Sequence, residues 1–317
     1  MQDVFMNNVF YGNMSDYDAQ VLLDILIGDF INSVKLKMSS KATYNSQLRS
    51  FALWFKRQKI SQPDEQSIIS FCSHLKHDKN CSDLTIKGYL TALKSFFSWL
   101  NGANAYPDIA RNVHVSEYTY KPRKNSLTPT QVKTLLDSIN CTTLEGKRDF
   151  ALINLMIGTG LRCIEIKNLV RGDIANCCGL QVLWIRAKEA NGEGENMYIP
   201  DNVFKPIRNY LEARESTSDT DYLFISHSKK NFGQPLTVRS ISRIIKNRLI
   251  DAKIDYSRLS PSSLRYTSIQ LNLLMYTNQE QAYSMVQKAD INTMLAYTRQ
   301  LKNQQIKVSR KKNTKLF

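Results

Sequence analysis

The sequence has few of the side chains from which metal centres and disulfide frameworks are built. It has four histidines in 317 residues, of which only His74 and His77 stand at a helical spacing suited to metal ligands. We interpret that pair as part of a solvated helix face. The six cysteines form no C-x-x-C pair or other metal-ligand spacing. We therefore predict free thiols, no metal site and a reducing, cytoplasmic compartment.

Motifs of nucleotide-dependent and hydrolytic enzymes are missing as well. The sequence contains no Walker A loop, no G-x-G-x-x-G, no H-E-x-x-H and no G-x-S-x-G. Its longest uncharged core-like run, residues 150–161, is too short to span a bilayer. The first residues, MQDVFMNNVFYG, lack a basic segment followed by an apolar run, so we expect no secretory signal. From these absences we predict that the protein uses no cofactor and has no membrane partner.

Acidic residues are outnumbered by basic ones. The chain has 43 Lys plus Arg against 28 Asp plus Glu, which gives a net charge of +15. Such an excess attracts polyanions, of which nucleic acid is the commonest. A membrane-surface role fits less well, because the basic residues are spread along the chain and not gathered on one amphipathic helix. Hydrophobic residues make up 42%, enough for real cores, and the length suits two domains.

The first half of the chain is predicted to be a helical bundle, residues 20–104, after an N-terminal extension, residues 1–19. Apolar residues recur at helical spacing in three segments: 39–58, 64–77 and 81–102. We expect Ser39 or Ser40 to cap the first segment and Ser82 the third. Three polar residues outside the apolar faces are candidates for DNA contact, with a merely solvated surface as the alternative: Thr43, Lys87 and Lys94.

The middle of the chain, residues 105–126, lacks helical periodicity and contains two prolines. Its cluster of Lys121, Arg123 and Lys124 predicts an interdomain linker that touches a polyanion. A solvated linker without such contact is the alternative.

The second half, residues 127–300, is predicted to combine helices with a β-hairpin. Thr128 and Pro129 are typical of a helix start. Residues 180–200 are rich in β-formers on both sides of a glycine-containing turn, so they predict a hairpin. The fold class is therefore mainly α with a small β-hairpin or sheet, that is α+β, followed by a basic tail, residues 301–317.

Three cations in this half stand in unusual surroundings. Arg162 directly follows a Gly-Thr-Gly break, Lys188 stands just before the hairpin turn, and Arg265 lies in the first turns of an otherwise apolar helix. A guanidinium in apolar surroundings is costly unless it forms an ion pair or binds an anion. The pattern therefore favours an anion site.

The segments around these cations resemble the tyrosine recombinases of the phage integrase family. GTGLRCIEIKNLVRGDI resembles the family's first arginine box, with Glu165 and Asp173 in place, and LSPSSLRYT resembles its H-x-x-R box. QKADINTMLAYTR resembles the closing G-H-x-x-I-x-T-T-x-x-Y segment, and its spacing to Tyr297 matches without a gap. The resemblance is clear over residues 127–300. It is weaker over the helical first half, which resembles the family's SAM-like core-binding domain.

The resemblance implies a site-specific DNA recombinase or integrase that needs no metal and no nucleotide. Arg162 and Arg265 would clamp the nonbridging phosphate oxygens, on which charge grows during the displacement. Tyr297 would attack phosphorus and form a covalent 3′-phosphotyrosine. Lys188 matches the family's general acid, which protonates the departing deoxyribose oxygen.

Two positions depart from the family's pattern. Ser262 stands where the family most often has His, and Lys288 stands where it has His or Trp. Serine donates a hydrogen bond but is no base near neutral pH, whereas lysine can contact phosphate. The chain is therefore a slow enzyme, an enzyme in which Lys188 or Lys288 compensates, or a catalytically degenerate DNA-binding relative.

Each assignment has a plain structural alternative. Arg162 would merely pair with Glu165, Lys188 and Lys288 would be solvated, Ser262 would only start a helix, and Tyr297 would be a packing residue. At the level of function, the alternatives are a sequence-specific DNA-binding protein of the same fold and a type IB topoisomerase-like enzyme.

The resemblance also implies how DNA is held. The family's two halves close around duplex DNA, and three basic residues of the segment 237–248 would face phosphates or a major groove: Arg239, Arg243 and Lys246. The implied partners are double-stranded recombination sites, a homotetramer in the synaptic complex and accessory DNA-bending proteins. The tail stands where the family has a segment exchanged between protomers, and a basic tail on DNA is the alternative.

Overall fold

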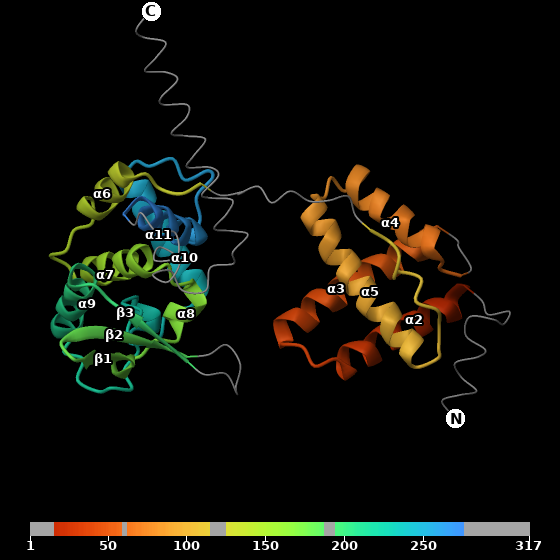
Figure 1. Cartoon of the computed structure of the whole chain (residues 1–317), viewed down its shortest axis with the longest axis horizontal. Coiled ribbons are helices and arrows are strands. Elements are labelled where there is room, and N and C mark those ends of the chain that lie inside the picture. Colours follow the sequence, from red (N-terminus) through yellow and green to blue (C-terminus); the bar gives the residue numbers. More distant parts are fainter. Residues whose placement is uncertain (1–15, 59–61, 115–124, 187–193, 276–317) are drawn as a thin grey trace, which may run out of the picture. The chain divides into compact units, whose positions relative to one another are not determined.

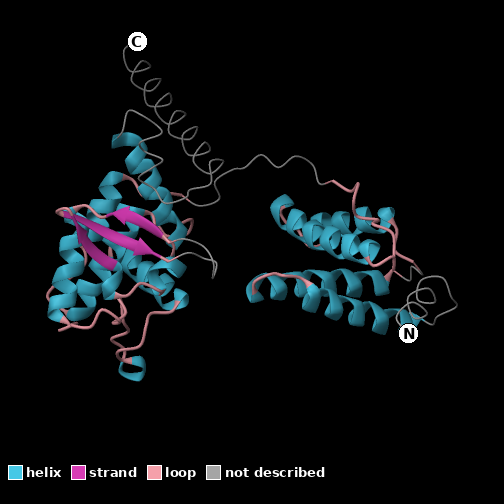
Figure 2. Cartoon of the chain, turned by 60° about the horizontal axis from the view of Figure 1, so that its bottom comes forward, coloured by secondary structure: helices cyan, strands magenta, loops and turns pink. Residues whose placement is uncertain are grey.

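A computed structural model describes residues 16–58, 62–114, 125–186 and 194–275 of the chain (Figure 1). The chain divides into two compact units, Met1–Thr119 and Tyr120–Phe317, each with its own hydrophobic core. The described residues are mainly helical and include one small antiparallel sheet, so the predicted fold class is confirmed. Among the described residues, all strands belong to the second unit (Figure 2).

The first unit is built from helices that pack around aromatic rings. Its described helices are α2 (Asp16–Ser33), α3 (Met38–Arg57), α4 (Glu65–His77) and α5 (Asp83–Gly102). The Ser82 hydroxyl accepts a hydrogen bond from the Thr85 backbone at 3.2 Å, so Ser82 caps α5 as predicted. Phe71 of α4 meets Phe51 of α3 with ring centroids 5.2 Å apart, and such edge contacts join the helices.

The predicted cap of α3 is wrong. The helix begins at Met38, and Lys37 stands at the N-cap position without a side-chain cap. Ser39 and Ser40 therefore lie inside the first turn, where the backbone is already helical. A hydroxyl caps a helix only from the residue that precedes it.

The second unit surrounds a buried central helix, α7. Its described helices are α6 (Pro129–Asp137), α7 (Leu144–Thr159), α8 (Cys163–Lys167), α9 (Asp201–Ala213), α10 (Val238–Asp251) and α11 (Pro261–Met275). Thr128 caps α6 and Pro129 occupies its first turn, as predicted. α9 and α11 both pack against α7, which explains why α7 is apolar on most of its surface.

The sheet has the strand order β1-β2-β3, with β1 (Ile174–Cys177), β2 (Leu180–Ile185) and β3 (Glu195–Tyr198) all antiparallel to their neighbours. The predicted hairpin corresponds to β2 and β3, which pair from Val182↔Tyr198 to Ile185↔Glu195. β1 is an addition that the sequence did not reveal.

The segment that enters the second unit is fastened to α11. The Leu127 backbone donates to Thr267 Oγ1 at 2.8 Å, and the Ser126 hydroxyl donates to the Gln270 side chain. The Asn125 backbone donates to the Arg258 carbonyl at 3.0 Å. The start of the unit is thereby tied to the helix that carries Arg265.

Candidate active site

A left-handed turn at the end of α7 positions the first arginine. Gly160 ends the helix with φ 70°, and its N–H donates to the Met156 carbonyl at 2.9 Å. Glycine suits this position because a side chain disfavours positive φ. The chain then turns through the buried Leu161 to Arg162, the N-cap residue of α8.

Arg162 is held in place by the acidic residue of its own box. Its backbone N–H donates to Glu165 Oε2 at 2.7 Å, and its guanidinium Nη1 donates to Glu165 Oε1 at 2.9 Å. The Glu165 side chain is largely buried, whereas the Arg162 side chain is 40% exposed. The ion pair expected as the structural alternative therefore exists. It uses only one of the five guanidinium donors and leaves the group half-exposed.

Arg265 reaches the same turn from α11. The side chain is buried, with the residue only 6% exposed, and Nη1 donates to the Gly160 carbonyl at 2.5 Å. Burial, followed by the positive charge of Arg162, lowers the pKa of Arg265 to about 10. The two guanidinium groups are therefore close enough to repel each other. An anion between them would relieve this repulsion.

Ser262 lies on the exposed surface of the first turn of α11, three residues before Arg265. This spacing puts the two side chains on neighbouring positions of one helix face. The helix start is held by the next residue instead, because Ser263 Oγ accepts from the Ser260 backbone at 3.0 Å. Ser262 thus stands at the start of α11, as its structural alternative predicted.

Several predicted residues lie outside the described part of the chain. They are the general-acid candidate Lys188, the phosphate candidate Lys288, the nucleophile candidate Tyr297, and the linker cations Lys121, Arg123 and Lys124. Their roles stay predictions.

Arg186, the described residue that follows β2, is held by a buried carboxylate. Asp173 is 5% exposed and accepts from the Val170 backbone at 2.8 Å. It also accepts from Arg186 Nη2 at 3.2 Å, directly after the end of β2. Asp173, a residue of the first arginine box, thus links the end of β2 to the segment after α8. β2 is the strand that precedes Lys188 in the sequence.

The predicted DNA-contact residues of α10 stand on a helix that packs against α8. Arg239, Arg243 and Lys246 are all exposed. The N-cap residue of α8 is Arg162, so α10 lies next to the helix that Arg162 starts.

In the first unit, the three candidates differ in their surroundings. Thr43 on α3 and Lys87 on α5 are exposed, and the Thr43 hydroxyl donates to the Ser39 carbonyl at 3.0 Å. Lys94 is partly buried and its Nζ donates to the Arg111 carbonyl at 3.1 Å. Lys94 therefore also holds the segment after α5.

Thr267 is a residue that the sequence interpretation missed. It is fully buried, donates to the Ser263 carbonyl and accepts from Leu127, which links the domain entry to the turn before Arg265. The only signal was one hydroxyl among several polar side chains of α11. Such a signal does not reveal a partner 140 residues away.

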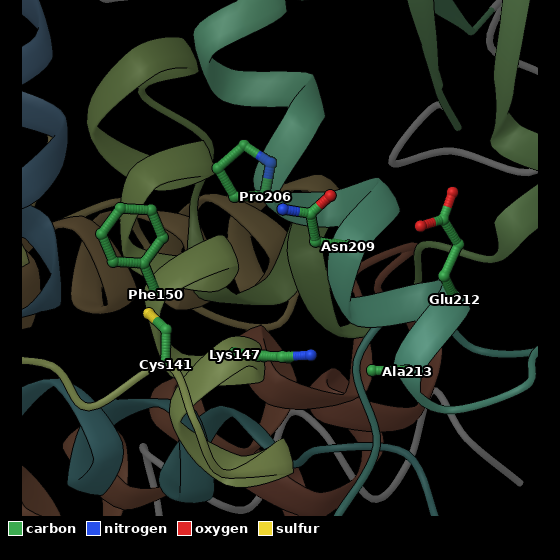
Figure 3. Close-up of a pocket in the computed structure, with 7 residues that line it drawn as sticks. All are labelled: Cys141, Lys147, Phe150, Pro206, Asn209, Glu212 and Ala213. Carbon is green, nitrogen blue, oxygen red and sulfur yellow. The ribbon is translucent and has the colours of Figure 1, made fainter.

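A cavity of about 360 Å³ lies away from these residues, between the start of α7 and α9 (Figure 3). It is lined by Cys141, Lys147, Phe150, Pro206, Asn209, Glu212 and Ala213. Lys147 stands near the opposite end of α7 from Gly160, about 20 Å away at the helical rise. The cavity is therefore separate from the arginine pair.

Within the described ranges, no three His, Cys, Asp or Glu side chains form a group that would hold a metal ion. None of the described helices has the length and apolar character that a membrane crossing requires.

The fold and the two arginine boxes together define a tyrosine recombinase-like second unit, which follows a helical first unit in the sequence. Residues 125–304 match the Phage integrase family, and residues 26–105 match the phage integrase N-terminal SAM-like domain. The chain belongs to the phage integrase family, so the resemblance predicted from the sequence is confirmed.

The relatives in this family are tyrosine recombinases. XerD of Staphylococcus saprophyticus is 24% identical over 294 residues, covering 89% of this chain and 96% of the relative. XerA of Pyrococcus furiosus is 27% identical over 276 residues, covering 86% and 89%. A solved structure of the XerH site-specific recombinase, in a post-cleavage complex with palindromic difH substrate, has a TM-score of 0.69 at 18% identity and covers 98% of this chain and 88% of that one. The last likeness shows that the fold is the same.

Proposed function

We propose that the chain is a site-specific recombinase that cuts and rejoins DNA strands through Tyr297. The observation that carries the proposal is the arginine pair: Glu165 orients Arg162, the Gly160 carbonyl holds Arg265, and burial, followed by the charge of Arg162, lowers the pKa of Arg265. A phosphodiester has the charge and the paired oxygens that such a clamp fits.

In the proposed reaction, the Tyr297 hydroxyl loses its proton to solvent, its oxygen forms a bond to phosphorus, and the bond from phosphorus to the 5′ oxygen breaks. Arg162 and Arg265 stabilise the charge on the nonbridging oxygens, and Lys188 supplies the proton that the 5′ oxygen takes up. The product is a 3′-phosphotyrosine and a free 5′ hydroxyl, which reverse to reseal the strand. Ser262 and Lys288 would donate to the phosphate in place of imidazole.

The proposal assigns residues 127–300 to catalysis and residues 20–104 to binding of the DNA core site. It assigns residues 105–126 to a linker that lies along the DNA backbone. Xer relatives and a XerH complex with its DNA substrate support double-stranded recombination sites as the partner. A homotetramer and accessory DNA-bending proteins belong to the same proposal. So do the exposed cations of α10, a helix that packs against α8, which Arg162 starts.

The test uses nicked duplex DNA that carries a site for the enzyme, and it measures the covalent protein–DNA adduct. We expect an adduct with the wild-type chain and none with Tyr297→Phe. Arg162→Ala and Arg265→Ala are each expected to slow adduct formation by about a hundredfold or more, because each removes a charge-stabilising donor.

The outcomes separate the competing functions. An adduct that survives Tyr297→Phe excludes this tyrosine as the nucleophile. Sequence-specific binding without an adduct at any pH supports the DNA-binding alternative. That alternative is suggested by Ser262, which stands where the family most often has His. Relaxation of supercoiled DNA by a monomer without site preference supports the topoisomerase-like alternative.

A further inference from the structure

The loop of residues 226–234, which precedes α10, is closed by its own backbone. The Ser226 N–H donates to the Gln234 carbonyl at 2.8 Å, and the Gly233 N–H donates back to the Ser226 carbonyl at 3.0 Å. An isolated β-bridge between Ile225 and Pro235 joins the two ends. The loop is therefore a defined structure with a short, paired base.

Buried side chains anchor this loop to the rest of the unit. Arg148 Nη1 donates to the Ile225 carbonyl at 3.3 Å, and the Tyr210 hydroxyl is 3.0 Å from His227 Nε2. The His227 ring in turn meets the Phe232 ring edge to face, with centroids 5.9 Å apart. Phe232 thus packs against His227 on one side, while most of its side chain is exposed to solvent.

The outer surface of the loop combines an apolar ring with two cations. Phe232 is 67% exposed, and Lys229 and Lys230 of the short helix η2 (Lys229–Asn231) are exposed beside it. A single exposed apolar residue is common on protein surfaces, so its setting decides its meaning. Among the residues that the structure describes, no ion pair involves either lysine.

The chain continues from this loop into α10, which carries further exposed cations. Thr237 caps α10, whose N-terminal end carries the positive pole of the helix dipole and, in its first turns, Arg239 and Arg243. Exposed cations therefore follow one another along the chain from the loop into the first turns of α10, a helix that packs against α8.

We propose that the loop of residues 226–234 is a DNA-contact element, in which Lys229 and Lys230 bind phosphates and Phe232 packs against sugars and base edges of the adjoining groove. The inference rests on the proposed function, because its ligand is duplex DNA. Charge complementarity selects this ligand: the surface is apolar at one point and cationic around it, as a phosphate-lined groove requires. The loop extends the protein's hold on DNA beyond the scissile phosphate.

The experiment measures binding of the full chain to random-sequence duplex DNA by fluorescence anisotropy over a series of KCl concentrations. Lys229→Ala and Lys230→Ala are each expected to lower the salt-dependence slope by about 0.9, one phosphate contact. Phe232→Ala is expected to weaken binding about tenfold and to leave the slope unchanged, since the lost contact is uncharged. Lys205→Ala and Tyr222→Ala, an exposed lysine and an exposed aromatic elsewhere on the unit, serve as matched controls without effect.

A photo-crosslink gives a direct second measurement. Phe232 is replaced by p-benzoylphenylalanine, and irradiation with duplex DNA is expected to join the chain to DNA. Loop variants that bind like the controls, or a crosslink that forms only to a second copy of the chain, overturn the proposal. If the chain forms an adduct at Tyr297 but the loop variants bind DNA normally, the loop proposal is rejected and the proposed function stands. If these variants bind DNA more weakly but the wild-type chain forms no adduct, the loop proposal stands and the proposed reaction is rejected.

Discussion

Arg265 is a buried cation whose neighbour is another cation. Burial and Arg162 together lower its pKa, which means that the charged form is disfavoured in the folded protein. The lowered value of about 10 still leaves the group charged near neutral pH. An anion bound between the two guanidinium groups would offset this cost, which is the physical reason to expect that the pair binds a phosphate.

This electrostatic strain predicts a specific response to sulfate, which has the shape and charge of a phosphate group. Sulfate at about ten times its Kd should stabilise the second unit by about 1.4 kcal/mol, or roughly 3–5 °C in the unfolding midpoint. Arg162→Ala and Arg265→Ala should lose this increment. Differential scanning calorimetry in sodium sulfate and in sodium chloride of equal ionic strength measures it.

Sulfate also stabilises proteins in general because it is excluded from their surfaces. Arg208→Ala controls for this effect, since Arg208 is an exposed arginine of α9 and is not part of the site. It should respond to sulfate as the wild type does. Equal responses in all four proteins would mean that the arginine pair binds no anion.

The sequence located both arginines because each lies in a short local motif, but it did not locate what orients them. Glu165 lies three residues from Arg162 and was visible as a possible partner. The contact of Arg265 with the Gly160 carbonyl spans 105 residues, and that of Leu127 with Thr267 spans 140. Long-range polar contacts depend on how the helices pack, which residue patterns do not specify.

At the scale of elements, the turn between α7 and α8 is where fold and site meet. Gly160 ends one helix with positive φ, its carbonyl receives Arg265, and Arg162 starts the next helix. Gly160→Ala should therefore lower the free energy of unfolding by about 1 kcal/mol, because alanine disfavours this conformation. It should also slow adduct formation at Tyr297 by about tenfold or more, since the carbonyl and the N-cap move together.

Gly179→Ala is the matched control for this variant. Gly179 also has positive φ, at 83°, and an added Cβ would meet nothing within 4 Å in the turn between β1 and β2. It should cost similar stability in a urea titration but leave the adduct rate unchanged. If both variants slow the reaction equally, the loss reflects general destabilisation and not the geometry of the turn.

Helices were predictable here because their apolar spacing and caps are local, as at Ser82 and Thr128. β1 was not, because its four residues are mostly exposed and show no alternation. The turn into β2 has positive φ at both Cys178 and Gly179. Such turns usually carry Asn-Gly or Asp-Gly, so the Cys-Gly pair hid the hairpin.

At the scale of the whole molecule, the two units have separate cores. Phe71 lies in the core of the first unit and Ile207 in that of the second, and each is almost fully buried. A domain with its own core can unfold as its own cooperative unit. The chain without DNA is therefore expected to show two thermal transitions.

Core substitutions assign these two transitions. Phe71→Ala should destabilise the first unit by about 3–5 kcal/mol, and Ile207→Ala the second by about 2–5 kcal/mol, because each leaves a cavity. In calorimetry, each variant should lower one midpoint and leave the other where it is. Duplex DNA should raise both midpoints of the wild type, since the proposal places DNA-contact residues in both units. A single transition that both variants shift together would contradict independent units. A rise of only one midpoint would confine DNA contact to that unit.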